Sequence, residues 1–267
     1  MKRIALTFLA LAAILCAVCW HYRGQLALAL RGLGTPLNLS ESHLPKPDAE
    51  RYATMKEDVE RWRKNLAARH AKAKTPAEKD KVLVETRGFL EAVLPEMMRC
   101  WLGTRWDFHG TTEVPGEGKI ACGYFVATVL RDAGFRVDRY KLAQQSSQSI
   151  LRSFLPRESL SLQVGAPYDA YAAGLKKAEP GIRIVGLDSH VAFLVTGKDD
   201  FRFIHSSGSK PWCVVDEGEK EADVLRRSNY RVQGSLTADK DVLRRWLGGK
   251  TIEVREDSPA TAAADRR

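Results

Sequence analysis

The sequence predicts an α+β protein, in which helices come first and an antiparallel sheet follows. Apolar residues between positions 52 and 66 recur at steps of three and four, which is the period of an amphipathic helix. From Ile182 onward, apolar residues instead form short runs separated by glycine-containing turns, which is typical of β-strands. Hydrophobic residues make up 44% and charged residues 28% of the 267 residues, a composition that excludes a largely disordered chain.

The N-terminal segment has the pattern of an export signal. Lys2 and Arg3 precede an uncharged, mostly apolar run at positions 4–20. As a helix this run is about 25 Å long, between a usual signal sequence and a full membrane span. No clear small-x-small cleavage site follows it, which slightly favours a membrane anchor over a cleaved signal peptide, with a buried soluble helix as the alternative. We therefore expect residues 1–23 to direct the protein out of the cytoplasm, into the periplasm or another extracytoplasmic space.

The remaining chain divides into four parts. Residues 24–47 are rich in turn-forming residues and are expected to be a linker, and residues 48–99 to form a helical hairpin. Thr75, Pro76 and Glu78 provide an N-cap, a first-turn proline and a capping-box glutamate for the second helix of this hairpin. Residues 100–256 form the main domain, and the aperiodic tail at 257–267 is expected to be disordered.

Within the main domain, the pattern predicts one central helix followed by a sheet. The helix begins at Cys122 and ends at Gly134, which occupies the position favoured by a C-terminal glycine. The expected strands are Ile182–Val185, His190–Val195, Phe201–Ile204, Trp212–Val215 and Tyr230–Gln233. Thr237 is expected to cap a last helix that runs to Leu247.

Charge and cysteine content restrict the partners and the redox state. The formal net charge is +9, with basic residues scattered along the chain, which favours a soluble basic surface and leaves attraction to an anionic polymer or membrane open. No recognition helix, zinc-finger spacing or aromatic–basic stripe indicates nucleic-acid binding. Three of the five cysteines lie in the main domain. If Cys122 stays free to react, Cys100 and Cys213 are the candidates for a disulfide.

Cys122 is a candidate nucleophile because it follows a glycine-rich loop at the first turn of a helix. The N–H groups and positive dipole end of a helix lower a thiol's pKa, and the same N–H groups can bind an oxyanion. A base is also needed, and His190 opens a predicted strand while His205 ends the next one. Antiparallel pairing of these strands places both imidazoles at one end of the sheet. Taken alone, Cys122 on an apolar helix is more often a buried small residue; the joint pattern reverses that preference.

Three segments of the main domain together form one pattern. The first has a cysteine at the start of a helix, and the other two are strands that each contain a histidine. They are Ala121-Cys122-Gly123-Tyr124-Phe125-Val126, His190-Val191-Ala192-Phe193-Leu194 and Phe201-Arg202-Phe203-Ile204-His205-Ser206. In this order they resemble NlpC-type papain-like cysteine peptidases, a superfamily related to CHAP amidases. The resemblance runs from Gly103 to Ser206. It departs from the family at Ala121-Cys122-Gly123, where Asp-Cys-Ser is usual, and in the long segment from Tyr140 to Gly181.

The resemblance implies a papain-like domain, with helices packed on a small antiparallel sheet, that hydrolyses peptide or amide bonds, often in peptidoglycan. Cys122 would be the nucleophile, His190 the base and His205 the residue that orients it, without a cofactor or metal. We expect Trp106, Asp107 and Tyr124 to contact the substrate or its oxyanion. Two alternatives remain, an acyltransferase with the same site and a non-catalytic envelope module. A zinc site from Cys122, His190, His205 and Cys213 lacks a close-spaced ligand pair.

Overall fold

The computed structural model describes residues 45–256, which belong to one compact unit. The predictions for the signal or anchor at 1–23, for most of the linker at 24–47 and for the tail at 257–267 lie outside the described residues. Within residues 45–256, no helix is both long and apolar enough to cross a membrane. The predicted α+β class is confirmed, since helices pack on an antiparallel sheet.

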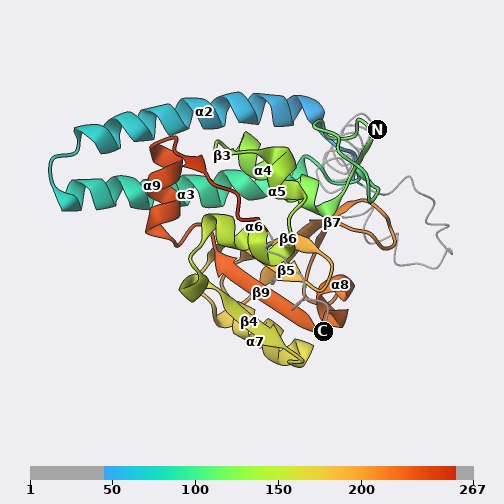
Figure 1. Ribbon diagram of the computed structural model, residues 1–267. Helices are drawn as coiled ribbons and strands as arrows, with labels where there is room; N and C mark the ends of the chain where they lie inside the picture. Colours follow the sequence, from blue (N-terminus) through green and yellow to red (C-terminus); the bar gives the residue numbers. More distant parts are fainter. Residues whose placement is uncertain (1–44, 257–267) are drawn as a thin grey trace, which may run out of the picture. The chain divides into compact units, whose positions relative to one another are not determined.

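Two long antiparallel helices, α2 (Ala49–Lys72) and α3 (Pro76–Arg99), form the predicted hairpin (Figure 1). The capping box at the start of α3 is present as predicted, with Thr75 accepting from the N–H of Glu78 and the Glu78 carboxylate accepting from the N–H of Thr75. α9 (Lys240–Leu247) packs against both helices. The hairpin therefore shares a hydrophobic core with the rest of the described chain.

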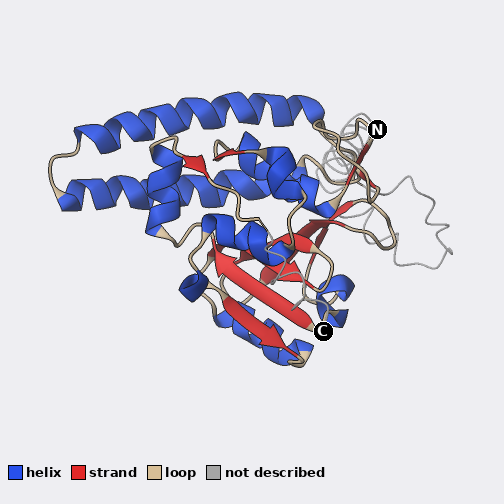
Figure 2. Cartoon of the chain, viewed as in Figure 1, coloured by secondary structure: helices blue, strands red, loops and turns tan. Residues whose placement is uncertain are grey.

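One six-stranded antiparallel sheet forms the centre of the fold, with strand order β4-β9-β5-β6-β7-β8 (Figure 2). Its strands are β4 (Ser161–Val164), β5 (Gly181–Leu187), β6 (Val191–Thr196), β7 (Phe201–Ser206), β8 (Val214–Glu217) and β9 (Tyr230–Ser235). Each of the five predicted runs overlaps one of these strands, but only Val214 and Val215 of the run Trp212–Val215 belong to β8. β4 was not predicted: it is a four-residue edge strand, and its two apolar residues, Leu162 and Val164, are exposed rather than buried in the core.

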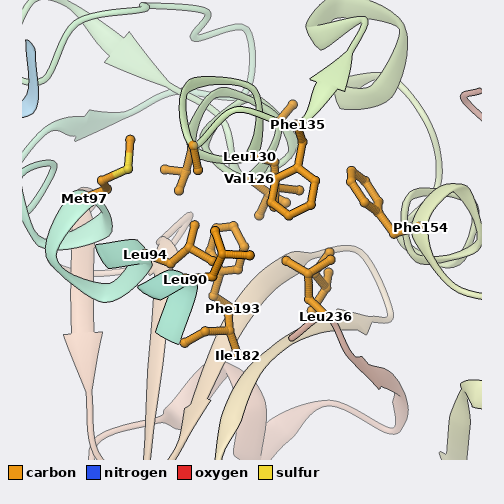
Figure 3. Close-up of a cluster of buried hydrophobic side chains, with 14 of the residues drawn as sticks. Leu90, Leu94, Met97, Val126, Leu130, Phe135, Phe154, Ile182, Phe193 and Leu236 are labelled. Carbon is orange, nitrogen blue, oxygen red and sulfur yellow. The ribbon is translucent and has the colours of Figure 1, made fainter. Parts of the chain in front are cut away.

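Helices cover both faces of the sheet. α3, α4 (Cys122–Asp132) and α6 (Ser147–Phe154) pack on one face through a core that joins side chains such as Leu94, Val126, Phe154 and Phe193 (Figure 3). The other face packs against α7 (Tyr168–Lys177) and α8 (Asp223–Arg227). The expected order, helices first and sheet second, is therefore only partly right, since α7 and α8 interrupt the strands.

Short elements complete the description. α5 (Arg139–Ala143) follows α4, and a 3₁₀ turn spans Arg157–Ser159. Two parallel two-residue pairs, β1 (Arg105–Trp106) with β2 (Lys119–Ile120) and β3 (Arg136–Val137) with β10 (Thr251–Ile252), hold loops in place.

Two expectations about single residues are wrong. Cys100 and Cys213 are free, buried thiols, so the expected disulfide is not formed. Thr237 does not cap α9: Asp239 does, by accepting from the N–H groups of Asp241 and Val242. The Thr237 hydroxyl instead donates to Glu91 and accepts from the N–H of Ile182, which ties β5 to α3.

Candidate functional site

Cys122 is the first residue of α4, as the sequence predicts. The residue before it, Ala121, has extended backbone and no side chain that could accept from the first-turn N–H groups. The first intrahelical bond is donated by Phe125 to the Ala121 carbonyl, at 2.8 Å. The N–H groups of the preceding residues have no intrahelical acceptor, so this helix end offers donors beside a thiol. Gly134, with a φ of 90°, ends the helix region as expected.

Hydrogen bonds hold the start of α4 against the end of β7. The hydroxyl of Ser206, the residue after His205, donates to the carbonyl of Ile120 at 2.7 Å.

Gly123 has a packing role that the sequence did not reveal. A Cβ at this position would lie 2.4 Å from the Ala143 carbonyl oxygen, so the serine usual in the resembled family would not fit without a shift.

His190 and His205 meet at this end of the sheet. His190 lies directly before β6 and His205 lies within β7, and their Nε2 and Nδ1 atoms are 2.8 Å apart. The backbone N–H of Val191, the residue after His190, acts to lower the pKa of the Cys122 thiol, and Cys122 and His190 line the same cavities. The structure thus brings the three predicted catalytic residues together.

Glu217, which sequence reasoning missed, extends this arrangement. Its Oε2 lies 3.2 Å from Nε2 of His205. Strand register places it there: His205 pairs with Val215 and Phe203 pairs with Glu217, so Glu217 is the diagonal neighbour of His205 across β7 and β8. The predicted strand stopped at Val215, and no local signal marked Glu217.

The geometry assigns a tautomer to each imidazole. An ionised Glu217 can only accept, so His205 donates its Nε2–H and keeps a lone pair on Nδ1. His190 then donates its Nε2–H to that lone pair. Its own Nδ1 therefore carries a lone pair, as a general base requires. Glu217 thus acts on the base through His205.

Burial sets the resting charge of the thiol and its partner. Burial raises the pKa of Cys122, and hydrogen bonds from the N–H groups of Val191, Gly123 and Cys122 offset this only in part. Burial, followed by the nearby His205, holds the pKa of His190 well below its ordinary value. The expected lowering of the thiol pKa by the helix end is therefore outweighed. The resting pair is a neutral thiol and a neutral imidazole.

The two outer groups have shifted pKa values as well. Burial lowers the pKa of His205 to about 3, so this ring is neutral. Burial, with the negative charges of Asp223 and Glu221, raises the pKa of Glu217 to about 7. The tautomer sequence derived above requires the ionised form of Glu217, which predominates above pH 7.

Two open cavities, of about 690 and 620 Å³, meet at the candidate site. Five residues line both: Cys122, Gly123, Ala143, Ser189 and His190. We name the first cavity the aromatic arm; its other lining residues are Trp106, Phe108, His109, Thr111, Ala121, Tyr124, Gln144, Gly208, Ser209 and Val224. We name the second the polar arm; its other lining residues are Gln145, Ser146, Ser147, Gln148, Val164, Leu187, Asp188, Val191, Asn229 and Tyr230. The thiol thus lies where a bound chain could extend to either side.

Of the three residues that we expected to contact the substrate, two line the cleft and one does not. Trp106 and Tyr124 line the aromatic arm, and so does His109. Asp107 lines neither arm, so its expected contact is not supported. Its carboxylate is held elsewhere, by Lys119 at 2.9 Å and by the N–H of His109 at 2.9 Å.

Within residues 45–256, no group of three or more His, Cys, Asp or Glu side chains is placed to hold a metal ion. Comparisons with protein-family models, curated proteins and solved structures find no match to this chain.

Proposed function

We propose that this protein is a cysteine hydrolase that cleaves an amide bond through Cys122, His190 and His205. The observation that carries the proposal is the connected arrangement at the head of α4: a cleft-lining thiol beside first-turn N–H donors, next to an imidazole whose Nε2 is bound to His205. A nucleophile, a base and a residue that orients the base are the components of acyl transfer through a covalent intermediate.

The proposed reaction begins from a neutral pair. As the Cys122 sulfur bonds to the carbonyl carbon, Nδ1 of His190 takes the thiol proton, and the first-turn N–H groups of α4 stabilise the oxyanion. The C–N bond then breaks, the proton passes from His190 to the departing amine, and an acyl-enzyme remains. Water attacks this thioester with His190 again as base, which releases the acid and restores the thiol. Glu217 keeps His205, and hence His190, in the reactive tautomer.

The substrate class we propose is a peptide amide of peptidoglycan. Its support is the resemblance to NlpC-type enzymes and the predicted export signal at positions 4–20. An acyltransferase would share every residue of the site and differ only in the acceptor that replaces water.

The test is to incubate the full chain with purified peptidoglycan and its soluble fragments and to analyse the products by mass spectrometry. Hydrolysis predicts one new free amine and one new carboxyl group per event, with neither formed by Cys122→Ala. A product in which an acyl group has moved to another amine or hydroxyl would favour the acyltransferase. Binding without any product, or equal turnover by Cys122→Ala, would contradict the proposal.

A further inference from the structure

The cleft on either side of Cys122 differs in charge from the protein as a whole. The chain carries 42 lysine and arginine residues against 33 aspartate and glutamate residues. Yet no lysine or arginine among the described residues lines the aromatic arm or the polar arm. A carboxylate or phosphate bound in either arm away from the first-turn N–H groups of α4 would therefore meet no lysine or arginine to offset the hydration it loses.

Of the cations next in sequence to cleft residues, Arg105 is exposed and lines neither arm, and the buried guanidinium of Arg231 donates to the backbone carbonyls of Leu225, Ala166 and Arg226. Other cations close to the cleft are also directed elsewhere. Arg139 is buried, and its guanidinium stacks on the ring of Tyr124, 4.9 Å from the ring centroid. Lys119 is paired with Asp107 at 2.9 Å. Lys210 is exposed and lines neither arm. None of them is placed to neutralise an anion beside Cys122.

The polar arm contains a fixed negative charge. Asp188 is its one Asp or Glu among the described residues, and its carboxylate accepts from the Ser228 hydroxyl and from the N–H groups of Asn229 and Tyr230. Burial acts to raise the pKa of Asp188, but these hydrogen bonds outweigh it and leave the pKa lowered. The group stays ionised and repels a second carboxylate in this arm.

The remaining lining groups suit uncharged partners. The aromatic arm is lined by the rings of Trp106, Phe108 and Tyr124. Phe108 is 73% exposed, so its ring can pack against an apolar group of a substrate. The polar arm has the hydroxyl and amide side chains of Ser146, Ser147 and Gln148. These can bind neutral peptide groups by hydrogen bonds.

We infer that the substrate is uncharged on both sides of the scissile bond, with an apolar group in the aromatic arm and hydrogen-bonding neutral groups in the polar arm. For a peptide, this selects segments whose acidic side chains are amidated over segments with free carboxylates. The inference rests on the proposed function, since it describes the substrate of the same site.

The experiment uses two peptide chloromethyl ketones that differ only in having Gln or Glu next to the reactive carbon. Each is incubated with the full chain, and modification of Cys122 is followed by mass spectrometry. We expect the Gln probe to react at least about tenfold faster than the Glu probe, because the cleft has no cation to replace the water lost by the carboxylate. Equal rates, or a faster Glu probe, would overturn the inference while leaving the nucleophile assignment intact.

Two matched variants test whether charge is the cause. Gln144→Lys adds a cation to the aromatic arm and Val164→Lys adds one to the polar arm, where Val164 is exposed and is not among the residues inferred to bind the substrate. We expect one of them to raise the rate of the Glu probe severalfold and leave the Gln probe nearly unchanged, which also identifies the arm that holds the acyl side. If neither variant changes the ratio, the electrostatic inference is wrong. If neither probe modifies Cys122 faster than Cys100 or Cys213, both the inference and the proposed function fail.

Discussion

The N-termini of α3 and α4 differ in whether side chains accept hydrogen bonds from their first-turn N–H groups. At the start of α3, Thr75 and Glu78 satisfy each other's backbone N–H groups in a complete capping box. At the start of α4, Ala121 offers no side-chain acceptor. The first helical residue is Cys122, which carries the thiol. The first arrangement uses the donors of a helix end for stability. The second leaves them free to face a sulfur and a cleft.

The difference shows where function departs from the most stable local choice. Substituting a good N-cap by Ala typically costs about 1 kcal/mol, so an Ala N-cap forgoes stability of that order. At α4 this occurs beside the cleft, where unsatisfied donors are useful to an oxyanion. At α3, which lies away from both arms, no such use exists. Four predictions test this contrast.

The largest effect is expected from removing the thiol. Cys122→Ala should lower kcat/KM for amide hydrolysis by about 10⁴-fold or more, because no other group can form the acyl-enzyme. The matched control is Cys100→Ala, which removes a buried thiol 3.9 Å from the Met55 sulfur and away from the cleft. This control should keep activity within about threefold, at some loss of stability. Substantial activity in Cys122→Ala would refute the nucleophile assignment.

The second prediction concerns the charge of the resting thiol. Because the pKa of Cys122 is raised above the ordinary value of a thiol, its thiolate fraction should still grow about tenfold between pH 7 and pH 8. The rate of iodoacetamide labelling at Cys122 should therefore rise about tenfold across that range. Mass spectrometry of the labelled peptide measures it. A plateau that begins below pH 7 would instead indicate a preformed thiolate–imidazolium pair.

The third prediction concerns Glu217. Glu217→Leu leaves Nε2 of His205 without an acceptor and should lower kcat/KM by roughly 10 to 100-fold, with Glu217→Gln lying between it and the unmodified protein. Since the pKa of Glu217 is about 7, activity should rise as pH increases through 7, and both variants should lose this step. Measurement of kcat/KM against pH tests this.

Asp216→Asn is the control for Glu217. Asp216 is the neighbouring carboxylate, and its partners are Arg99 and Arg202 rather than a histidine. This variant should keep the pH step, moved slightly to lower pH because the charge of Asp216 makes the smallest of several contributions to the raised pKa of Glu217, and should affect mainly stability. If Asp216→Asn and Glu217→Gln change the profile equally, the specific role of Glu217 is wrong.

The sequence was sufficient to predict that Cys122, His190 and His205 lie together, because the position of each depends on a local signal. A glycine-rich loop, a helix start and two consecutive strands are all encoded by residues close in the chain. Glu217 depends instead on the register between β7 and β8, which no local pattern specifies. Asp107 lines neither arm and pairs instead with Lys119, a contact that also follows from tertiary structure and that the sequence did not reveal.

The charge of the thiol could not be predicted for a different physical reason. Position at a helix end and burial act on its pKa in opposite directions, and the sequence reveals only the first. The sequence also could not explain why residue 123 is glycine, where the resembled family usually has serine. The packing of α5 on α4 brings the Ala143 carbonyl so close to Gly123 that a side chain there would not fit without a shift.

The smallest effects test the two helix ends directly. Thr75→Ala removes the α3 cap and should lower the free energy of unfolding by about 1 kcal/mol without changing activity. Ala121→Ser adds a cap to α4 and should raise it by a few tenths to about 1 kcal/mol. An N-cap side chain accepts from the second or third helical N–H, here Gly123 or Tyr124, and leaves the N–H of Cys122 available. Activity should therefore stay within about threefold. Should Ala121→Ser stabilise the fold and yet lower kcat/KM more than tenfold, the substrate uses the deeper N–H groups, and the oxyanion site extends into the first turn of α4.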